Sequence, residues 1–174
     1  ELGISLSPKQ LEQFQTYYQE LMAWNRRINL TAITGYEDVQ LKHFLDSLSA
    51  AAVIGPWLDL EGCRLLDVGS GAGLPGLPLK IAFPKVKLVL LDSIAKKTSF
   101  LTHLNRRLGL QDVKVVTGRA EELAHHEGYR ERFDVVLSRA VAALPTLLEL
   151  TLPFCRIGGV FVAQKKGNIQ AEIE

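Results

Sequence analysis

A glycine-rich turn that directly follows a short apolar segment constrains this chain more than any other feature. Residues 65–76 read LLDVGSGAGLPG, and a helical pattern of apolar residues follows them. Glycines at such a position leave the backbone open, because no Cβ atom covers it and its N–H groups can face a ligand. The pattern predicts a buried strand, a ligand-binding turn and a helix in direct succession.

Short apolar segments alternate with helical patterns along the rest of the chain. The expected strands are 64–68, 88–91, 113–116, 134–137 and 160–163, and the expected helices between them are 77–83, 95–108, 120–125 and 143–154. Strands separated by helices form βαβ units, which require a parallel sheet with right-handed crossovers. We therefore predict a doubly wound α/β fold with its ligand at the carboxyl ends of the strands.

The N-terminal part of the chain is predicted to form a helical cap. Helical spacing indicates one helix from Pro8 to about Arg27 and a second helix over 36–53. By length the chain is one domain. We expect that domain to comprise the cap in residues 1–57 and the α/β core in residues 58–174.

Composition excludes several classes of protein. The 174 residues are 47% hydrophobic and 22% charged, as in an ordinary globular domain, and no apolar run approaches the roughly 20 residues that span a bilayer. Cys63 and Cys155 lack metal-site spacing, so we expect no metal and a reducing cytosol. Residues 61–110 carry eight basic and three acidic side chains, which favours an anionic partner.

Two kinds of ligand match the glycine turn. The glycines at 71–76 follow the GxGxxG pattern of NAD sites, but Asp67 would repel a pyrophosphate, and Pro75 and Pro78 lack the N–H groups that it would use. S-adenosylmethionine suits the turn better, because Asp67 can attract its ammonium or orient the loop, and loop amides can face its carboxylate. Residues 67–73 also follow the DxGxGxG pattern typical of class I methyltransferases.

Three further polar residues are expected around the same ligand. Asp92 ends the second strand, where an acid accepts hydrogen bonds from ribose hydroxyls, although it also suits the start of the next helix. Glu121 would meet the adenine edge or serve as a first-turn helix acid. Arg139 ends the fourth strand, where its guanidinium could hold the donor carboxylate or the edge of a guanine.

Motifs along the whole chain resemble one methyltransferase family. The motifs are the glycine turn at 67–76, Arg119 to Glu121, Ser138 to Ala140, Trp24 and Asn25, Asn29 to Thr31, His43, and Asp46 to Leu48. They resemble RsmG, also called GidB, a family that methylates N7 of a guanine in bacterial 16S rRNA. The resemblance implies a class I, Rossmann-like fold whose seven-stranded sheet would be completed by strands beyond Glu174.

The resemblance also implies S-adenosylmethionine as the methyl donor and S-adenosylhomocysteine as the product. By this likeness Gly69, Leu74, Ala120, Glu121 and Arg139 would contact the donor. Together with the residues derived from the pattern, the predicted donor site is Asp67, Gly69, Ser70, Gly71, Gly73, Leu74, Asp92, Ala120, Glu121 and Arg139.

The end of the fourth strand agrees with a guanine N7 target. Amino-group methyltransferases usually carry Asn/Asp-Pro-Pro-aromatic there, because the amine lone pair is delocalised into the ring. This chain instead has Ser-Arg-Ala-Val at 138–141. Guanine N7 has an in-plane lone pair and no proton, so it needs no general base. Carbon-5 methylation of a pyrimidine needs a cysteine nucleophile, whereas Cys155 is expected at an apolar helix end, where packing explains it.

The candidate catalytic residues are Arg139 and His43. Arg139 would either act in the active site or form an ion pair on the surface. A histidine in a helical cap also suits a purely structural role. Asp46 is expected to pair with His43 or with the turn at 29–31.

The expected partner is 16S rRNA in the small ribosomal subunit. Lys165 and Lys166 follow the fifth strand and are the predicted phosphate contacts, whereas Lys96 and Lys97 are expected on a solvated helix face. We expect a cytoplasmic monomer that contacts no membrane.

Three other functions compete with this prediction. They are a methyltransferase of the same fold that acts on a small molecule, an NAD-dependent oxidoreductase, and a non-catalytic RNA-binding module. Asp67 and the prolines oppose the oxidoreductase, and the intact turn with Asp92 opposes the binding module.

Overall fold

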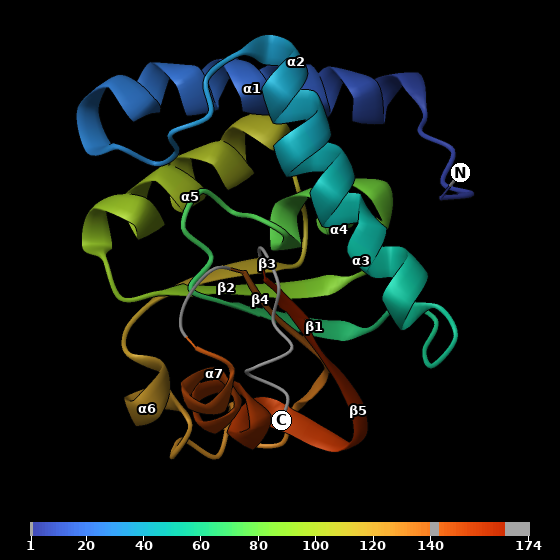
Figure 1. Ribbon diagram of the computed structural model, residues 1–174, viewed down its shortest axis with the longest axis vertical. Coiled ribbons are helices and arrows are strands. Elements are labelled where there is room, and N and C mark those ends of the chain that lie inside the picture. Colours follow the sequence, from blue (N-terminus) through green and yellow to red (C-terminus); the bar gives the residue numbers. More distant parts are fainter. Residues whose placement is uncertain (1, 140–142, 166–174) are drawn as a thin grey trace.

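Figure 1 shows a computed structural model that describes residues 2–139 and 143–165 as a parallel sheet between two layers of helices. The strands are β1 Arg64–Val68, β2 Lys87–Asp92, β3 Val113–Thr117, β4 Phe133–Arg139 and β5 Cys155–Gln164. Their order is β3-β2-β1-β4-β5, and every neighbouring pair is parallel. The predicted doubly wound α/β fold is confirmed.

The strand order creates the crevice that such sheets use for ligands. The chain moves outward from β1 through β2 to β3, then returns to the other side of β1 for β4. The carboxyl ends of β1, β2 and β4 therefore lie side by side at the point where the order reverses. Val68 pairs with Leu91 on one side and with Ser138 on the other, so the turn that follows β1 lies between the ends of β2 and β4.

The helices form two layers. One layer contains α4 Gly76–Ala82, α5 Ala95–Leu108 and the cap, and the other contains α6 Ala120–Leu123, α7 Leu144–Thr151 and the short 3₁₀ helix Leu152–Phe154 (Figure 1). Cys155 therefore begins β5 and does not end a helix as predicted. The strand starts five residues before the predicted boundary because this segment pairs with β4 from Phe133 onward.

Helix α1, Pro8–Ile28, anchors the cap to the core. Ser7 starts the helix with a capping box, in which its hydroxyl accepts from the Gln10 N–H and the Gln10 side chain accepts from the Ser7 N–H. The buried face of the helix includes Tyr17, whose hydroxyl donates to the Ala72 carbonyl in the glycine turn over 2.6 Å. The cap is thus bonded directly to the ligand-binding turn.

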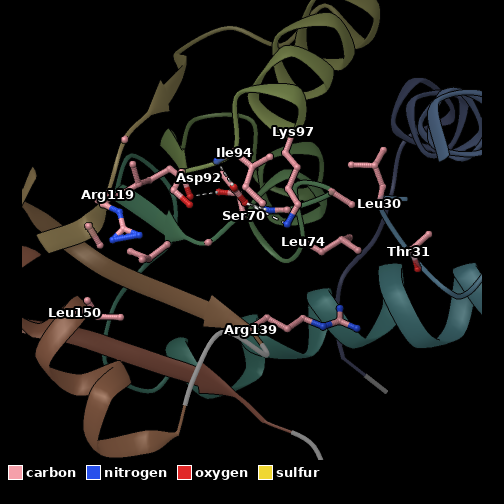
Figure 2. Close-up of a pocket in the computed structure, with 18 of the residues that line it drawn as sticks. Leu30, Thr31, Ser70, Leu74, Asp92, Ile94, Lys97, Arg119, Arg139 and Leu150 are labelled. Atoms are coloured by element: carbon pink, nitrogen blue, oxygen red, sulfur yellow. Dashed lines mark hydrogen bonds and ion pairs between the residues drawn. The ribbon is translucent and has the colours of Figure 1, made fainter. Parts of the chain in front are cut away.

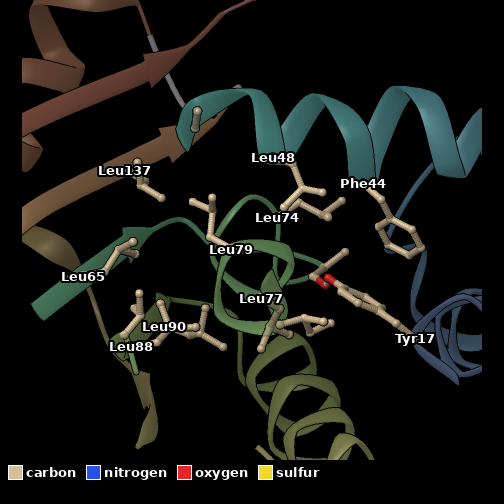
Figure 3. Packing of buried hydrophobic residues seen from close by; sticks show 14 of the residues in the cluster. Tyr17, Phe44, Leu48, Leu65, Leu74, Leu77, Leu79, Leu88, Leu90 and Leu137 are labelled. Atoms are coloured by element: carbon tan, nitrogen blue, oxygen red, sulfur yellow. Dashed lines mark hydrogen bonds between the residues drawn. The ribbon is translucent and has the colours of Figure 1, made fainter. Parts of the chain in front are cut away.

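One hydrophobic cluster joins cap and sheet. It includes Tyr17 and Phe44 from the cap, Leu77 from α4, and Leu65 and Leu137 from the strands (Figure 3). Because this apolar core is continuous, we propose that the cap in residues 1–57 and the core in residues 58–174 form one domain.

The second predicted cap helix is one continuous helical segment with a π-helical middle. It consists of α2 Tyr36–Val39, the π-helix Gln40–Leu45 and α3 Asp46–Ile54. Two of the π-helix carbonyls have side-chain donors: Arg139 donates to Lys42 and the Ser47 hydroxyl donates to His43. Such partners stabilise carbonyl groups that a wider turn leaves less well bonded, and π-turns often mark functional sites. Residue spacing alone predicts only a regular helix.

Gly73 gives a test of the packing between turn and cap. Its φ is +90°, and an added Cβ would lie 2.5 Å from Leu77 Cδ1 and 2.9 Å from the Tyr17 hydroxyl. Gly62 has φ +88°, but a Cβ there would meet nothing within 4 Å. Gly62→Ala should therefore cost only the backbone strain of roughly 1 kcal/mol, whereas Gly73→Ala should add overpacking and cost roughly 3 kcal/mol or more.

Urea unfolding of both variants measures this difference. Equal losses for Gly62→Ala and Gly73→Ala would show that the close approach of α1 and α4 to the turn is not tight.

Candidate functional site

The site is a cleft of about 550 Å³ at the carboxyl ends of β1, β2 and β4. Its walls are the glycine turn, the start of α5, the turn between β3 and α6, Arg139 on β4, and the cap around Leu30, Thr31 and His43 (Figure 2). Its volume lies in the range that holds a cofactor-sized molecule. The sheet and the cap thus contribute opposite walls of one cleft.

The glycine turn is fixed by hydrogen bonds to the end of β2. Gly69 and Ser70 donate their N–H groups to the Leu91 carbonyl over 2.8 and 3.0 Å, and the Gly71 N–H donates to Asp92 Oδ2 over 2.9 Å. The N–H groups of Gly73 and Leu74 both donate to the Ser70 carbonyl. These five N–H groups are therefore not available to a donor carboxylate.

The turn still offers close approach to its backbone. A Cβ added at Gly71 would meet only the Gly69 carbonyl, at 3.8 Å, so the space above this residue is open. Gly69, Ser70, Gly71 and Leu74 all line the cleft, as predicted from the sequence. A ligand can lie against this backbone because Gly71 has no side chain that would occupy the same space.

Asp67 holds the turn from below and does not line the cleft. The side chain is fully buried, and its Oδ2 accepts the Gly76 N–H over 2.9 Å. Of the two roles considered for Asp67, this geometry favours orientation of the loop over direct contact with a ligand. Burial, together with the nearby Asp92, raises the pKa of Asp67 to about 7, against the opposing effects of the Gly76 N–H and Arg139.

Gly73 is also outside the cleft wall. The space beside its Cα is filled by Leu77, Tyr17 and Leu101. A glycine is needed here because the turn packs against the cap and α5, and the contact of Gly73 with the donor stays a prediction. A one-dimensional pattern does not show to which side of the turn each glycine faces.

Asp92 joins the turn to the start of α5. Its Oδ2 accepts the Gly71 N–H and its Oδ1 accepts the Ile94 N–H, each over 2.9 Å. An ionised carboxylate has about four acceptor positions, so two remain for hydroxyl groups of a ligand in the cleft. The sequence-based position of Asp92 at the site is therefore supported.

Lys97 is a cleft residue that the sequence analysis placed on the solvated face of its helix. It lies in the first turn of α5, lines the cleft, and its Nζ is 4.0 Å from Asp92 Oδ2 (Figure 2). The sequence could have indicated this position of Lys97, because the helix that follows such a strand begins at the ligand site. Ile94, which begins the same turn, was missed for the same reason.

Arg139 reaches from β4 to the cap. Its Nη1 is 3.2 Å from Asp46 Oδ2, and its Nη2 donates to the Lys42 carbonyl over 2.8 Å and lies 3.3 Å from His43 Nδ1. The structure thus brings the two predicted catalytic residues, Arg139 and His43, together at the cleft. Arg139 does form an ion pair, but this pair lies within the site and not on the surface, since the Arg139 side chain is only 12% exposed.

The expected partners of Asp46 were wrong. Asp46 pairs with Arg139, and it is His43 that reaches the turn at 29–31, with Nε2 2.7 Å from Thr31 Oγ1. The widened π-helical turn carries both residues, so the ring and the carboxylate face different groups. Residue spacing in the sequence does not predict this π-helical turn.

The remaining predicted residues divide into three groups. Ala120 and Glu121 line the cleft beside Arg119, as expected. Lys165 directly follows β5 and does not line the cleft. Lys166 and the segment 140–142 lie outside the described residues.

The cysteines show no sign of catalytic activation. Cys63 lies just before β1, at the opposite end of the sheet from the cleft, and Cys155 begins β5. Burial raises the pKa of both thiols, which disfavours the nucleophilic thiolate. Within residues 2–139 and 143–165, no group of three or more His, Cys, Asp and Glu side chains could hold a metal ion. No helix in the described part of the chain has the length and apolar character of a membrane span.

Solved structures with this architecture define the class. The fold is similar to a putative S-adenosyl-L-methionine-dependent methyltransferase from Methanococcus maripaludis, with TM-score 0.59, 16% identity, and coverage of 74% of this chain and 59% of that one. It is also similar to MtNAS in complex with S-adenosylmethionine, with TM-score 0.59, 15% identity, and coverage of 93% and 59%. The protein has the Rossmann-like fold of class I methyltransferases.

Sequence relatives define the family within that class. The family rRNA small subunit methyltransferase G, or GidB, matches residues 10–174. Curated proteins named ribosomal RNA small subunit methyltransferase G are 55% identical in Dehalococcoides mccartyi, over 99% of this chain and 72% of the relative, and 48% identical in Alkaliphilus metalliredigens, over 100% and 72%. The chain belongs to this family, as its motifs predicted.

The buried carboxyl of Asp67 predicts a pH effect on stability. Because its pKa rises on folding, the folded protein keeps a proton on Asp67 that the unfolded chain releases above about pH 4. The stability from this group is complete below about pH 4 and is lost as the pH rises through about 7. Relative to Asp67→Asn, which is neutral throughout, the wild type should lose about 4 kcal/mol across that window.

Asp134→Asn is the matched control with the opposite sign. Burial raises the pKa of Asp134, but the Arg64 N–H and the Arg156 guanidinium outweigh it and lower the pKa overall. The wild type should therefore lose stability relative to Asp134→Asn as the pH falls below about 4. Unfolding by urea at several pH values measures both differences, and a pH-independent difference for Asp67→Asn would contradict the buried, protonated carboxyl.

Proposed function

We propose that this protein transfers the methyl group of S-adenosylmethionine to N7 of a guanine in the 16S rRNA of the small ribosomal subunit. The observation that carries the proposal is the cleft itself, with an open glycine turn and Asp92 on one wall and Arg139, His43 and Thr31 on the other. Membership of the rRNA small subunit methyltransferase G family supports the same substrate class.

The donor wall fits S-adenosylmethionine. The open backbone at Gly71 admits the sulfur-bearing chain, and the two free acceptor positions of Asp92 suit the ribose hydroxyls. Ala120 and Glu121 would border the adenine. Since five N–H groups of the turn are used within the protein, the cations Arg139 and Lys97 are the groups that would hold most of the carboxylate charge.

The reaction requires orientation more than acid–base chemistry. S-adenosylmethionine supplies an electrophilic methyl group, and guanine N7 already has the in-plane lone pair that accepts it. The cap wall around Thr31, His43 and Arg139 would hold the base so that N7 lies in line with the bond between the sulfur and the methyl group, which breaks in the reaction. Such positioning supplies a large part of the rate enhancement in bimolecular reactions.

The rRNA would approach from the open side of the cleft. The basic side chains of residues 61–110 favour an anionic partner, and Lys165 and Lys166 would contact phosphates near the ends of the strands. We also propose that the enzyme works as a monomer in the cytoplasm.

Replacement of Asp92 tests the donor wall. Asp92→Asn should raise the Kd for S-adenosylmethionine by about 10-fold or more, because it removes a charged acceptor for the ribose. Asp59→Asn is the matched control, since Asp59 accepts the N–H two residues ahead in the same way but lies before β1, far from the cleft. Calorimetry gives both constants. Preferential binding of NAD by the wild type would instead support an oxidoreductase.

Replacement of Arg139 tests the site as a whole. Arg139→Ala should lower kcat/KM by about 100-fold, because both the cap wall and the donor wall lose the group that orients them. Arg27→Ala, an exposed arginine on α1 outside residues 61–110, is the control and should retain full activity.

The assay uses labelled donor with small ribosomal subunits from cells that lack the enzyme, and maps the label on the rRNA. Label at a guanine N7 supports the proposal. Label only in a small molecule, or at another position of the rRNA, would refute the substrate assignment.

A further inference from the structure

Thr31 is held rigidly at the rim of the cleft. The Asn25 side chain makes two hydrogen bonds to its backbone: Nδ2 donates to the Thr31 carbonyl over 2.9 Å, and Oδ1 accepts the Thr31 N–H over 2.8 Å. Thr31 lines the cleft on the cap side, near Arg139 (Figure 2). Its hydroxyl is therefore placed by the fold and does not depend on a mobile side chain.

The position of Arg139 decides the tautomer of His43. Arg139 Nη2 is 3.3 Å from His43 Nδ1, and a guanidinium can only donate hydrogen bonds. We therefore assign the lone pair to Nδ1, where it faces the cationic guanidinium, and the hydrogen to Nε2. The other tautomer would donate from Nδ1 to the Lys42 carbonyl at 3.1 Å, but its hydrogen would then face the Nη2 hydrogens of Arg139, which would repel it.

This tautomer makes the Thr31 hydroxyl a pure donor. His43 Nε2–H donates to Thr31 Oγ1 over 2.7 Å, and the Ile33 N–H donates to the same oxygen over 3.0 Å. A hydroxyl oxygen has two acceptor positions, and both are then occupied. The hydroxyl hydrogen is the remaining hydrogen-bonding group, and no described residue accepts it in the structure.

We propose that the Thr31 hydroxyl donates a hydrogen bond to O6 of the target guanine and thereby selects guanine over adenine. The inference rests on the proposed function. On the edge that carries N7, guanine presents the acceptor O6, whereas adenine presents the N6 amino donors. Because the Thr31 oxygen cannot accept a further hydrogen bond, the N6 amino donor of adenine would meet the Thr31 hydroxyl donor without forming a bond. The bond to O6 leaves the N7 lone pair free for the methyl group.

Three variants separate this role from a structural one. Thr31→Val removes the hydroxyl at nearly constant volume and should lower kcat/KM on small ribosomal subunits by about 10- to 100-fold, with an unchanged Kd for S-adenosylmethionine. Thr31→Ser keeps the hydroxyl and should restore most of the activity. Thr34→Val, an exposed threonine of the same loop, makes the same chemical change outside the cleft and should behave as the wild type.

A measurement on the wild type covers the case in which Thr31→Val does not fold. A long-range ¹H–¹⁵N spectrum of the imidazole rings shows which nitrogen of His43 carries the hydrogen, and the proposal requires Nε2. Hydrogen on Nδ1, full activity of Thr31→Val, or a loss of donor binding in that variant would each overturn the inference. If the wild type methylates no guanine N7, the proposed function itself fails; an active wild type with an equally active Thr31→Val refutes the Thr31 role alone.

Discussion

Two aspartate side chains on adjacent strands hold the glycine turn, and the rest of the site depends on this arrangement. Asp67 on β1 accepts the Gly76 N–H, and Asp92 on β2 accepts the Gly71 N–H. The turn is therefore fixed at both ends before any ligand binds. The two acids also influence each other, since Asp92 helps to raise the pKa of the buried Asp67. Both acids are buried, but Asp92 lines the cleft, where a ligand can reach it, whereas Asp67 lies beneath the turn and serves the fold.

Arg139 completes the site by joining the sheet to the cap. A single guanidinium contacts Asp46, the Lys42 carbonyl and His43, so β4 is tied to the π-helical turn of the cap. The same contacts set the hydrogen on His43 and, through it, the direction in which Thr31 can hydrogen-bond. The proposed positioning of the substrate base thus depends on hydrogen bonds that run from Arg139 at the end of β4 through His43 to Thr31.

The sequence predicted the framework well, and its errors have a common cause. The five strands, the reversal of strand order, and the positions of Asp92, Glu121 and Arg139 all follow from the alternation of apolar segments and turns. Apart from the early start of β5, the errors concern which way a side chain faces: Lys97 faces the cleft and Asp46 faces Arg139. Local patterns do not encode direction, because direction depends on which distant element packs against the residue.

By itself, the sequence determined the class of fold, the place of the ligand turn and the family, since these depend on hydrophobic periodicity and on residues close together in the chain. Only the tertiary structure decided the hydrogen-bonding roles. Asp67 became a buried support, Asp46 became the partner of Arg139, and Thr31 became a donor, because residues separated by up to about a hundred positions meet at the cleft. The number of partners around each polar atom is set by that meeting, and the partners decide what the atom can still do for a substrate.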